Sequence, residues 1–174
     1  MKNELAWTST ILTVYKYLER ICGAIDKIIM QRALGSTNIV GQNYFYNNTL
    51  AVSEKIIDLS ERKITLINLK VLIEETLAEI NQNDAQILIY KYVDCLRHRE
   101  IADACGVGLR TIFRKTASAE ATFKSRLCSK GYNDIKLKDM LRNEGWINNI
   151  YSNLVEKDNG FEISNAYLAR AVSM

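Results

Sequence analysis

The chain has no proline, only eight glycines and a single histidine, His98, in 174 residues. Without proline, nothing in the sequence forces long helices to break. One histidine, with no recognisable pair of acids, offers little for catalysis, so we do not expect an enzyme. The stretch GSTNIVGQNYFYNN contains glycines but lacks the Gly-Lys-Ser/Thr ending of a phosphate-binding loop.

The four cysteines are widely spaced and form no CxxC pair: Cys22, Cys95, Cys105 and Cys128. Zinc sites draw their ligands from close pairs, so we predict neither a metal site nor a cofactor. In a reducing compartment such thiols behave as small hydrophobic side chains.

Long apolar runs are also missing, because no stretch reaches the roughly 20 uncharged residues needed to cross a bilayer. The opening residues, MKNELAWTST, lack the basic-then-apolar layout of a secretory signal. We therefore expect a cytoplasmic protein that does not engage membranes. Its apolar fraction of 48% and charged fraction of 25% are typical of globular proteins.

Positive charge is concentrated in one segment. Residues 97–130 hold eight cations and three anions, a balance of +5, whereas the whole chain is only +3 and the remainder is therefore −2. A local excess of this kind is the electrostatic footprint of a polyanion-binding surface, although a solvated helical face has the same composition.

Apolar residues at helical spacing predict an all-α fold. One amphipathic helix is expected over residues 4–34, followed by a polar loop at 35–48. Thr49 is the expected cap of a second helix ending near Asn81, and Asn83 or Asp84 the expected cap of a third. We divide the chain into a helical region (1–81), a central domain (84–130) and a helical extension (131–174) with Trp146 packed on the body.

The helix over 49–81 is unusually long, about 50 Å at 1.5 Å per residue. Its main apolar stripe repeats every seven residues: Leu59, Leu66, Ile73 and Ile80. A second stripe is expected to widen the buried face: Ile57, Ile64, Ile67 and Val71. A wide stripe serves equally for packing within one chain and for a homodimer contact through 49–81, and the sequence leaves both open.

The segment REIADACGVGLRTIFRK, residues 99–115, has the layout of a helix-turn-helix. A small residue, Ala102, lies where two helices would cross. Gly106 follows four residues later, where the chain must turn in a left-handed conformation. Gly108 can begin the second helix. Four apolar residues are placed to lock the two helices together: Ile101, Cys105, Val107 and Ile112.

Together with the preceding helix, residues 84–128 resemble region 4 of bacterial sigma factors and the phage and Gram-positive regulators built on it. Tyr92-Val93-Asp94, Glu100-Ile101-Ala102 and Arg110-Thr111-Ile112 align without gaps. The resemblance implies a four-helical domain whose last helix enters the DNA major groove, with RNA polymerase as a further candidate partner.

The sequence departs from the family at four positions. Cys95 replaces a usual glycine, Thr116 replaces an aliphatic core residue, and Ser118 and Glu120 replace frequent arginines. No segment resembles the region that melts and reads the −10 element. The resemblance therefore indicates a transcriptional regulator that reads double-stranded DNA rather than a complete sigma factor.

By its match to the family, the second helix (109–127) carries the base-reading residues: Leu109, Arg110, Phe113 and Arg114. Arginine binds guanine through two parallel hydrogen bonds, and Leu109 or Phe113 can touch a thymine methyl group. Phe113 can instead pack on a neighbouring part of the protein. A second set is placed for phosphate contacts, which orient the protein on DNA: Arg97, Arg99, Thr111 and Lys115. His98 is expected to be exposed or to cap locally.

Two other readings fit the same residues. The chain can be a sigma-like subunit bound to RNA polymerase, with residues 1–80 derived from a melting region. Alternatively, the corner is purely structural and the protein is a helical assembly or packaging factor that does not bind DNA.

Overall fold

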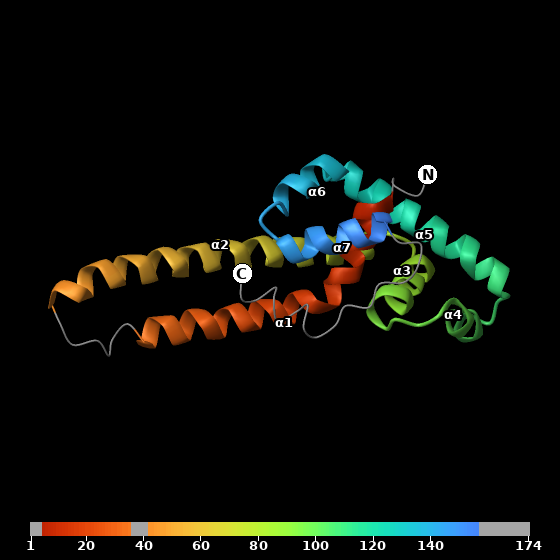
Figure 1. Ribbon diagram of the computed structural model, residues 1–174. Helices are drawn as coiled ribbons and strands as arrows, with labels where there is room; N and C mark the ends of the chain where they lie inside the picture. Colours follow the sequence, from red (N-terminus) through yellow and green to blue (C-terminus); the bar gives the residue numbers. More distant parts are fainter. Residues whose placement is uncertain (1–4, 36–41, 157–174) are drawn as a thin grey trace.

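A computed structural model describes residues 5–35 and 42–156, without the side chains of residues 35, 42–48 and 156. Within these ranges the secondary structure is entirely helical, which confirms the all-α prediction. Figure 1 shows two parts: a long arm at one end, and a cluster of shorter helices around the opposite end.

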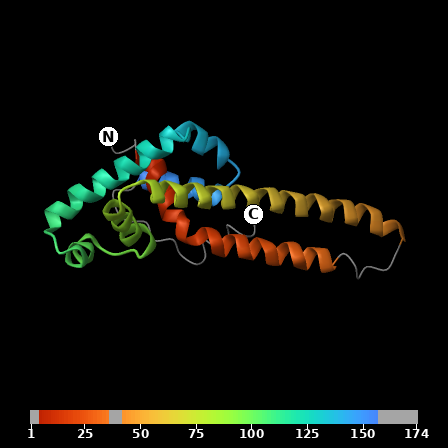
Figure 2. The same cartoon turned by 180° about the vertical axis from the view of Figure 1, so that it is seen from behind.

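The arm consists of α1 (Ala6–Gly35) and α2 (Gln42–Glu79), which run antiparallel and side by side in both views (Figures 1 and 2). At 38 residues, α2 is about 57 Å long. The first turns of α1 lie at an angle to the rest of the helix (Figure 1). There the hydroxyls of Thr10 and Thr13 donate to the carbonyl oxygens of Ala6 (2.7 Å) and Ser9 (2.6 Å), a contact that bends helices.

The main apolar stripe of α2, which repeats every seven residues, is buried within the chain against α1. Its residues share one core with α1, α5 and α7: Leu59, Leu66, Ile73 and Ile80 pack with Ile11, Leu18, Ile21 and Ile25. Lys63 binds Asp26 at 2.6 Å and Lys70 binds Glu19 at 3.2 Å across the two arm helices. This stripe therefore packs within one chain, which is one of the two alternatives that the sequence left open.

The predicted start of this helix was wrong. The helix begins at Gln42, so Thr49 lies inside it and is not its N-terminal cap. Residues 42–48 contain neither glycine nor proline, and a polar composition alone does not end a helix. Residues 36–41 of the predicted loop lie outside the described part of the chain.

The second stripe was also wrongly assigned to the buried face. Ile57, Ile64, Ile67 and Val71 are exposed, the first two at 56% and 57%. Because α1 covers the opposite side of α2, widening the buried face would have required a further helix along the stripe. Among the described residues, Tyr132 and Met140 reach only its Val71 end, where they line a pocket with Val71.

The central helices begin with α3 (Gln82–Leu88), which continues into a π-helical turn, η3 (Ile89–Val93). The cap of α3 is Asn81, whose side-chain oxygen accepts from the N–H of Asn83 at 2.9 Å. The predicted caps, Asn83 and Asp84, were wrong because the backbone is already helical there. The chain continues through α4 (His98–Cys105) and α5 (Leu109–Ser129).

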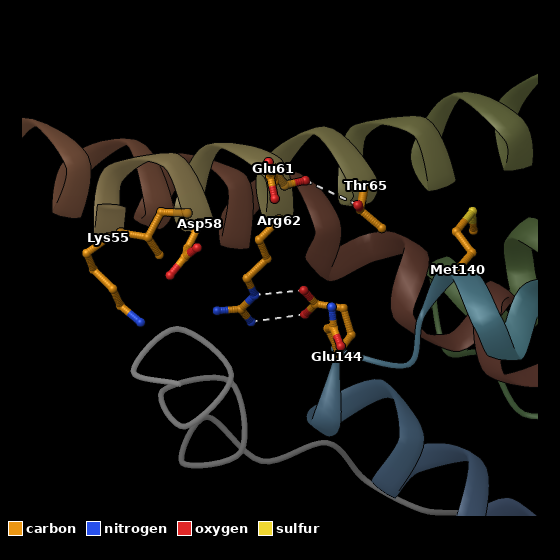
Figure 3. A pocket seen from close by; sticks show the side chains of 9 residues that line it. Lys55, Asp58, Glu61, Arg62, Thr65, Met140 and Glu144 are labelled. Carbon is orange, nitrogen blue, oxygen red and sulfur yellow. Dashed lines mark hydrogen bonds and ion pairs between the residues drawn. The ribbon is translucent and has the colours of Figure 1, made fainter. Parts of the chain in front are cut away.

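Two short helices, α6 (Asp134–Met140) and α7 (Gly145–Glu156), return the chain to the body. Trp146 is buried, as predicted, and its indole N–H donates to Glu144 at 2.7 Å. The same carboxylate accepts two hydrogen bonds from Arg62 of α2, at 2.7 and 3.0 Å (Figure 3). Trp7 stacks on Tyr151 with ring centroids 4.4 Å apart. These contacts fix α7 against both arm helices.

A pocket of about 340 Å³ lies beside this ion pair, between α2 and the connection of α6 to α7 (Figure 3). Arg62 and Glu144 in its lining bind each other, so their charges are already matched.

None of the described helices is long and apolar enough to span a membrane.

Candidate nucleic-acid interface

The corner between α4 and α5 has the predicted geometry. Gly106 adopts a left-handed conformation, with φ of 63°, and the N–H of Val107 donates to the carbonyl of Ala102 at 3.0 Å. Ala102 is buried where α4 meets α5. The turn therefore uses the freedom of glycine at the position that needs it.

A small core of its own holds this corner together. Its buried members are Ile87, Ile101, Ala102 and Ile112, and its partly buried members are Tyr90, Leu96, Cys105 and Val107. The four apolar residues predicted to hold the two helices together all belong to this core: Ile101, Cys105, Val107 and Ile112. Because Ile112 has no exposed surface, the inner side of α5 at its first turns is fixed against α3 and α4.

The opposite side of α5 faces outward. Arg110 and Arg114 are exposed one turn apart, and Leu109 and Phe113 beside them are 45% and 53% exposed. Figures 1 and 2 show that α4 and the start of α5 lie at the end of the molecule farthest from the tip of the arm. The four predicted base-reading residues therefore lie together on a projecting surface.

The predicted phosphate-binding residues flank this surface. Arg97 and Arg99 are exposed at the start of α4, Lys115 is exposed on α5, and Thr111 is half-buried. The backbone N–H of Arg97 donates to the Glu100 carboxylate at 2.6 Å, so this acid caps α4.

The first turn of α5 carries no acidic residue, and its cap Gly108 supplies no side-chain acceptor. The N–H groups at a helix start carry partial positive charge and attract anions. Together with Arg110, this helix start makes the projecting end electropositive.

His98 stacks on Phe113, with ring centroids 4.3 Å apart, rather than capping a helix. Burial and the nearby Lys91 lower the pKa of His98 below its usual value, against an opposing effect of Glu120. His98 is therefore uncharged at neutral pH and serves to hold the ring of Phe113. This partner could not be assigned from the sequence, because it depends on the angle between α4 and α5.

The structure divides the basic segment into two groups. Lys124 binds Asp134 at 3.1 Å, and Lys130 binds Glu79 at 2.8 Å and Glu75 at 3.2 Å. These two lysines fasten α5 to α6 and α2. The other six cations are exposed, and all but Arg126 lie at the projecting end: Arg97, Arg99, Arg110, Arg114 and Lys115.

Glu120 faces the core. It is buried, accepts from the Tyr92 hydroxyl at 2.7 Å and forms an ion pair with Lys91. The Tyr92 hydroxyl also lies 3.2 Å from the Ser9 hydroxyl of α1. Burial and the neighbouring carboxylate raise the pKa of Tyr92 well above 10, so it remains a hydrogen-bond donor. This network joins α5 to η3 and α1.

Cys95 has φ of 56° and is the only described non-glycine residue in the left-handed region. The Lys16 ammonium of α1 donates to its sulfur. The backbone at Cys95 therefore has the left-handed conformation that glycine favours, and its thiol contacts α1.

Thr116 is buried, and its hydroxyl has no hydrogen-bond partner within the described residues. We expect Thr116→Val to raise the free energy of unfolding by about 1 kcal/mol, because an unsatisfied hydroxyl is replaced by a methyl group of similar size. Urea denaturation measures this change. Thr122→Val is the matched control, since the Thr122 hydroxyl donates to the carbonyl of Ser118 at 2.9 Å and should not gain stability.

No known protein family, curated protein or solved structure matches this chain. What the interface offers a partner is therefore defined by its own geometry: a projecting helix start, an apolar pair and five exposed cations.

Proposed function

We propose that this protein is a sequence-specific transcriptional regulator that acts in the cytoplasm and inserts α5 into the major groove of double-stranded DNA. In this proposal residues 84–130 act as a sigma region 4-like domain. The observation that carries the proposal is the outward side of α5, where Arg110 and Arg114 stand one turn apart on a helix anchored by its opposite side.

The major groove is about 12 Å wide and admits one α-helix. Arg110 and Arg114 would each bind guanine O6 and N7, and Leu109 or Phe113 would contact a thymine methyl group. The stacking of Phe113 on His98 supports this role, since it holds the ring in one place while leaving half of it exposed.

Arg97, Arg99, Thr111 and Lys115 would contact phosphates on either side of the groove, helped by the positive end of α5. One such domain reads only a few base pairs. Specific complexes bury about 1,000 Å² or more of protein surface, so a second copy of the chain, or RNA polymerase, would supply the remaining contacts.

The test is selection of binding sites from random duplex DNA with the full chain, followed by footprinting. We expect a short enriched sequence containing guanines and protection of one groove face. Enrichment of no sequence, together with no salt-dependent binding, would favour a helical assembly factor instead.

Lys115→Ala should weaken binding to all DNA sequences alike. Its ammonium is expected to replace about one counterion on the phosphates, so the slope of log affinity against log salt should become shallower by about one unit. Fluorescence anisotropy at several salt concentrations measures this. Lys138→Ala, an exposed lysine of α6, is the control and should keep the original slope.

A further inference from the structure

The arm helix α2 has an exposed apolar face, here called the outer stripe: Leu50, Ile57, Ile64, Ile67 and Val71. Four of these residues follow one another at intervals of seven, with Ile67 in the companion position three residues after Ile64. Ser53 and Ser60 occupy the equivalent companion positions earlier in the stripe. Their small side chains allow another helix to approach closely.

The outer stripe lies on the side of α2 opposite its packed face. At 3.6 residues per turn, Ile57 and Ile64 point about 160° and 140° away from Leu59, which is buried against the core. A surface helix of a single chain needs only one apolar face. Two opposite apolar faces on α2 indicate a second packing partner.

We propose that the occupant of the outer stripe is α2 of a second copy of this chain, running parallel to the first. A seven-residue repeat packs best against a helix with the same repeat, and a second copy supplies one. The contact is then symmetric, each copy using the same surface about a two-fold axis along the arm.

The residues within and beside the stripe favour the parallel direction. Ile57, Ile64 and Val71 are β-branched and fall at the heptad position where such residues favour two parallel strands. In the antiparallel direction, Glu61 would face Glu61 of the second copy. In the parallel direction no like charges face each other beside the stripe, since Lys70 and Glu75, which meet there, have opposite signs and are already paired within their own chains.

The length of the outer stripe sets the expected affinity of the dimer. From Leu50 to Val71 it spans about three heptads and about 33 Å. A two-helix contact of this length lies at the low end of specific interfaces, so we expect a dissociation constant in the micromolar range. The parallel direction also places both α4–α5 corners at the same end of the dimer.

Self-association is tested by sedimentation equilibrium of the full chain without DNA, so the result is independent of the proposed function. We expect a monomer–dimer equilibrium. Ile64→Asp should weaken it at least about tenfold, because the substitution acts in both copies. Ile135→Asp is the matched control, since Ile135 on α6 is 80% exposed and should leave the equilibrium unchanged. Both residues are exposed, and circular dichroism verifies that both variants remain folded.

A monomer at high micromolar concentration, or equal dimerisation by Ile64→Asp and wild type, would overturn the proposal. The direction is tested by Ser60→Cys, which should form an intermolecular disulfide under mild oxidation because the two Ser60 positions face each other in the parallel dimer. Thr65→Cys, on another side of α2, and wild type give the background from the native cysteines. A dimer in which Ser60→Cys does not cross-link above this background would overturn the parallel arrangement.

Discussion

Glu120→Ala is expected to lower the free energy of unfolding by about 2–3 kcal/mol, and the melting temperature by roughly 5–10 °C. Removing the carboxylate leaves the buried Tyr92 hydroxyl without its 2.7 Å acceptor and Lys91 without its counter-charge. Because the Lys91 side chain is 27% exposed, water compensates part of this loss, which keeps the effect below that of a fully buried pair.

Thermal and urea denaturation of the two proteins measure the effect. Glu120→Gln should lose less, about 1 kcal/mol, since the amide oxygen still accepts from Tyr92. Glu61→Ala, an exposed acid on α2, is the control and should stay within about 0.5 kcal/mol of wild type. If Glu120→Ala were as stable as wild type, the carboxylate would not anchor α5.

Arg114→Ala is expected to weaken binding to the preferred DNA site by about 1–3 kcal/mol, roughly fivefold to 150-fold. The reason is loss of two parallel hydrogen bonds to one guanine. Binding to sites altered at that base pair should change much less, so discrimination at one position is lost. Titration of wild type and variant against a panel of single-base variants measures both quantities.

Arg142→Ala is the control for charge alone, because Arg142 is exposed on the connection between α6 and α7 and pairs with Asp139 at 3.8 Å. It should bind the preferred site as wild type does. Uniform weakening of all sites by Arg114→Ala would assign this arginine to a phosphate instead of a base. No weakening at all would remove it from the interface.

The fold of the corner could be predicted because its requirements are local. A small residue at Ala102, glycine at Gly106 and apolar residues four apart are set by the backbone of a tight turn, so they are visible in a short stretch of sequence. The first arm helix and the burial of Trp146 follow from the same periodicity and were also predicted correctly.

What depends on distant elements could not be predicted. The outer stripe looks like core in the sequence, because periodicity shows that a face is apolar but not what covers it. The resemblance indicated only that Glu120 replaces a frequent arginine. Its position between Ala119 and Phe123 on the inner side of α5 could have indicated burial. Its partners, Lys91 and Tyr92, are brought close only when η3 packs on α5.

The hydrogen bonds of Tyr92 connect the arm to the helix that carries the exposed cations. Its hydroxyl lies within hydrogen-bond distance of both Ser9 of α1 and Glu120 of α5, so it connects the bent beginning of α1 to the middle of α5. Moving the start of α1 relative to α5 would require one of these hydrogen bonds to break. The orientation of the cationic end relative to the arm therefore depends on contacts with α1 as well as on the corner between α4 and α5.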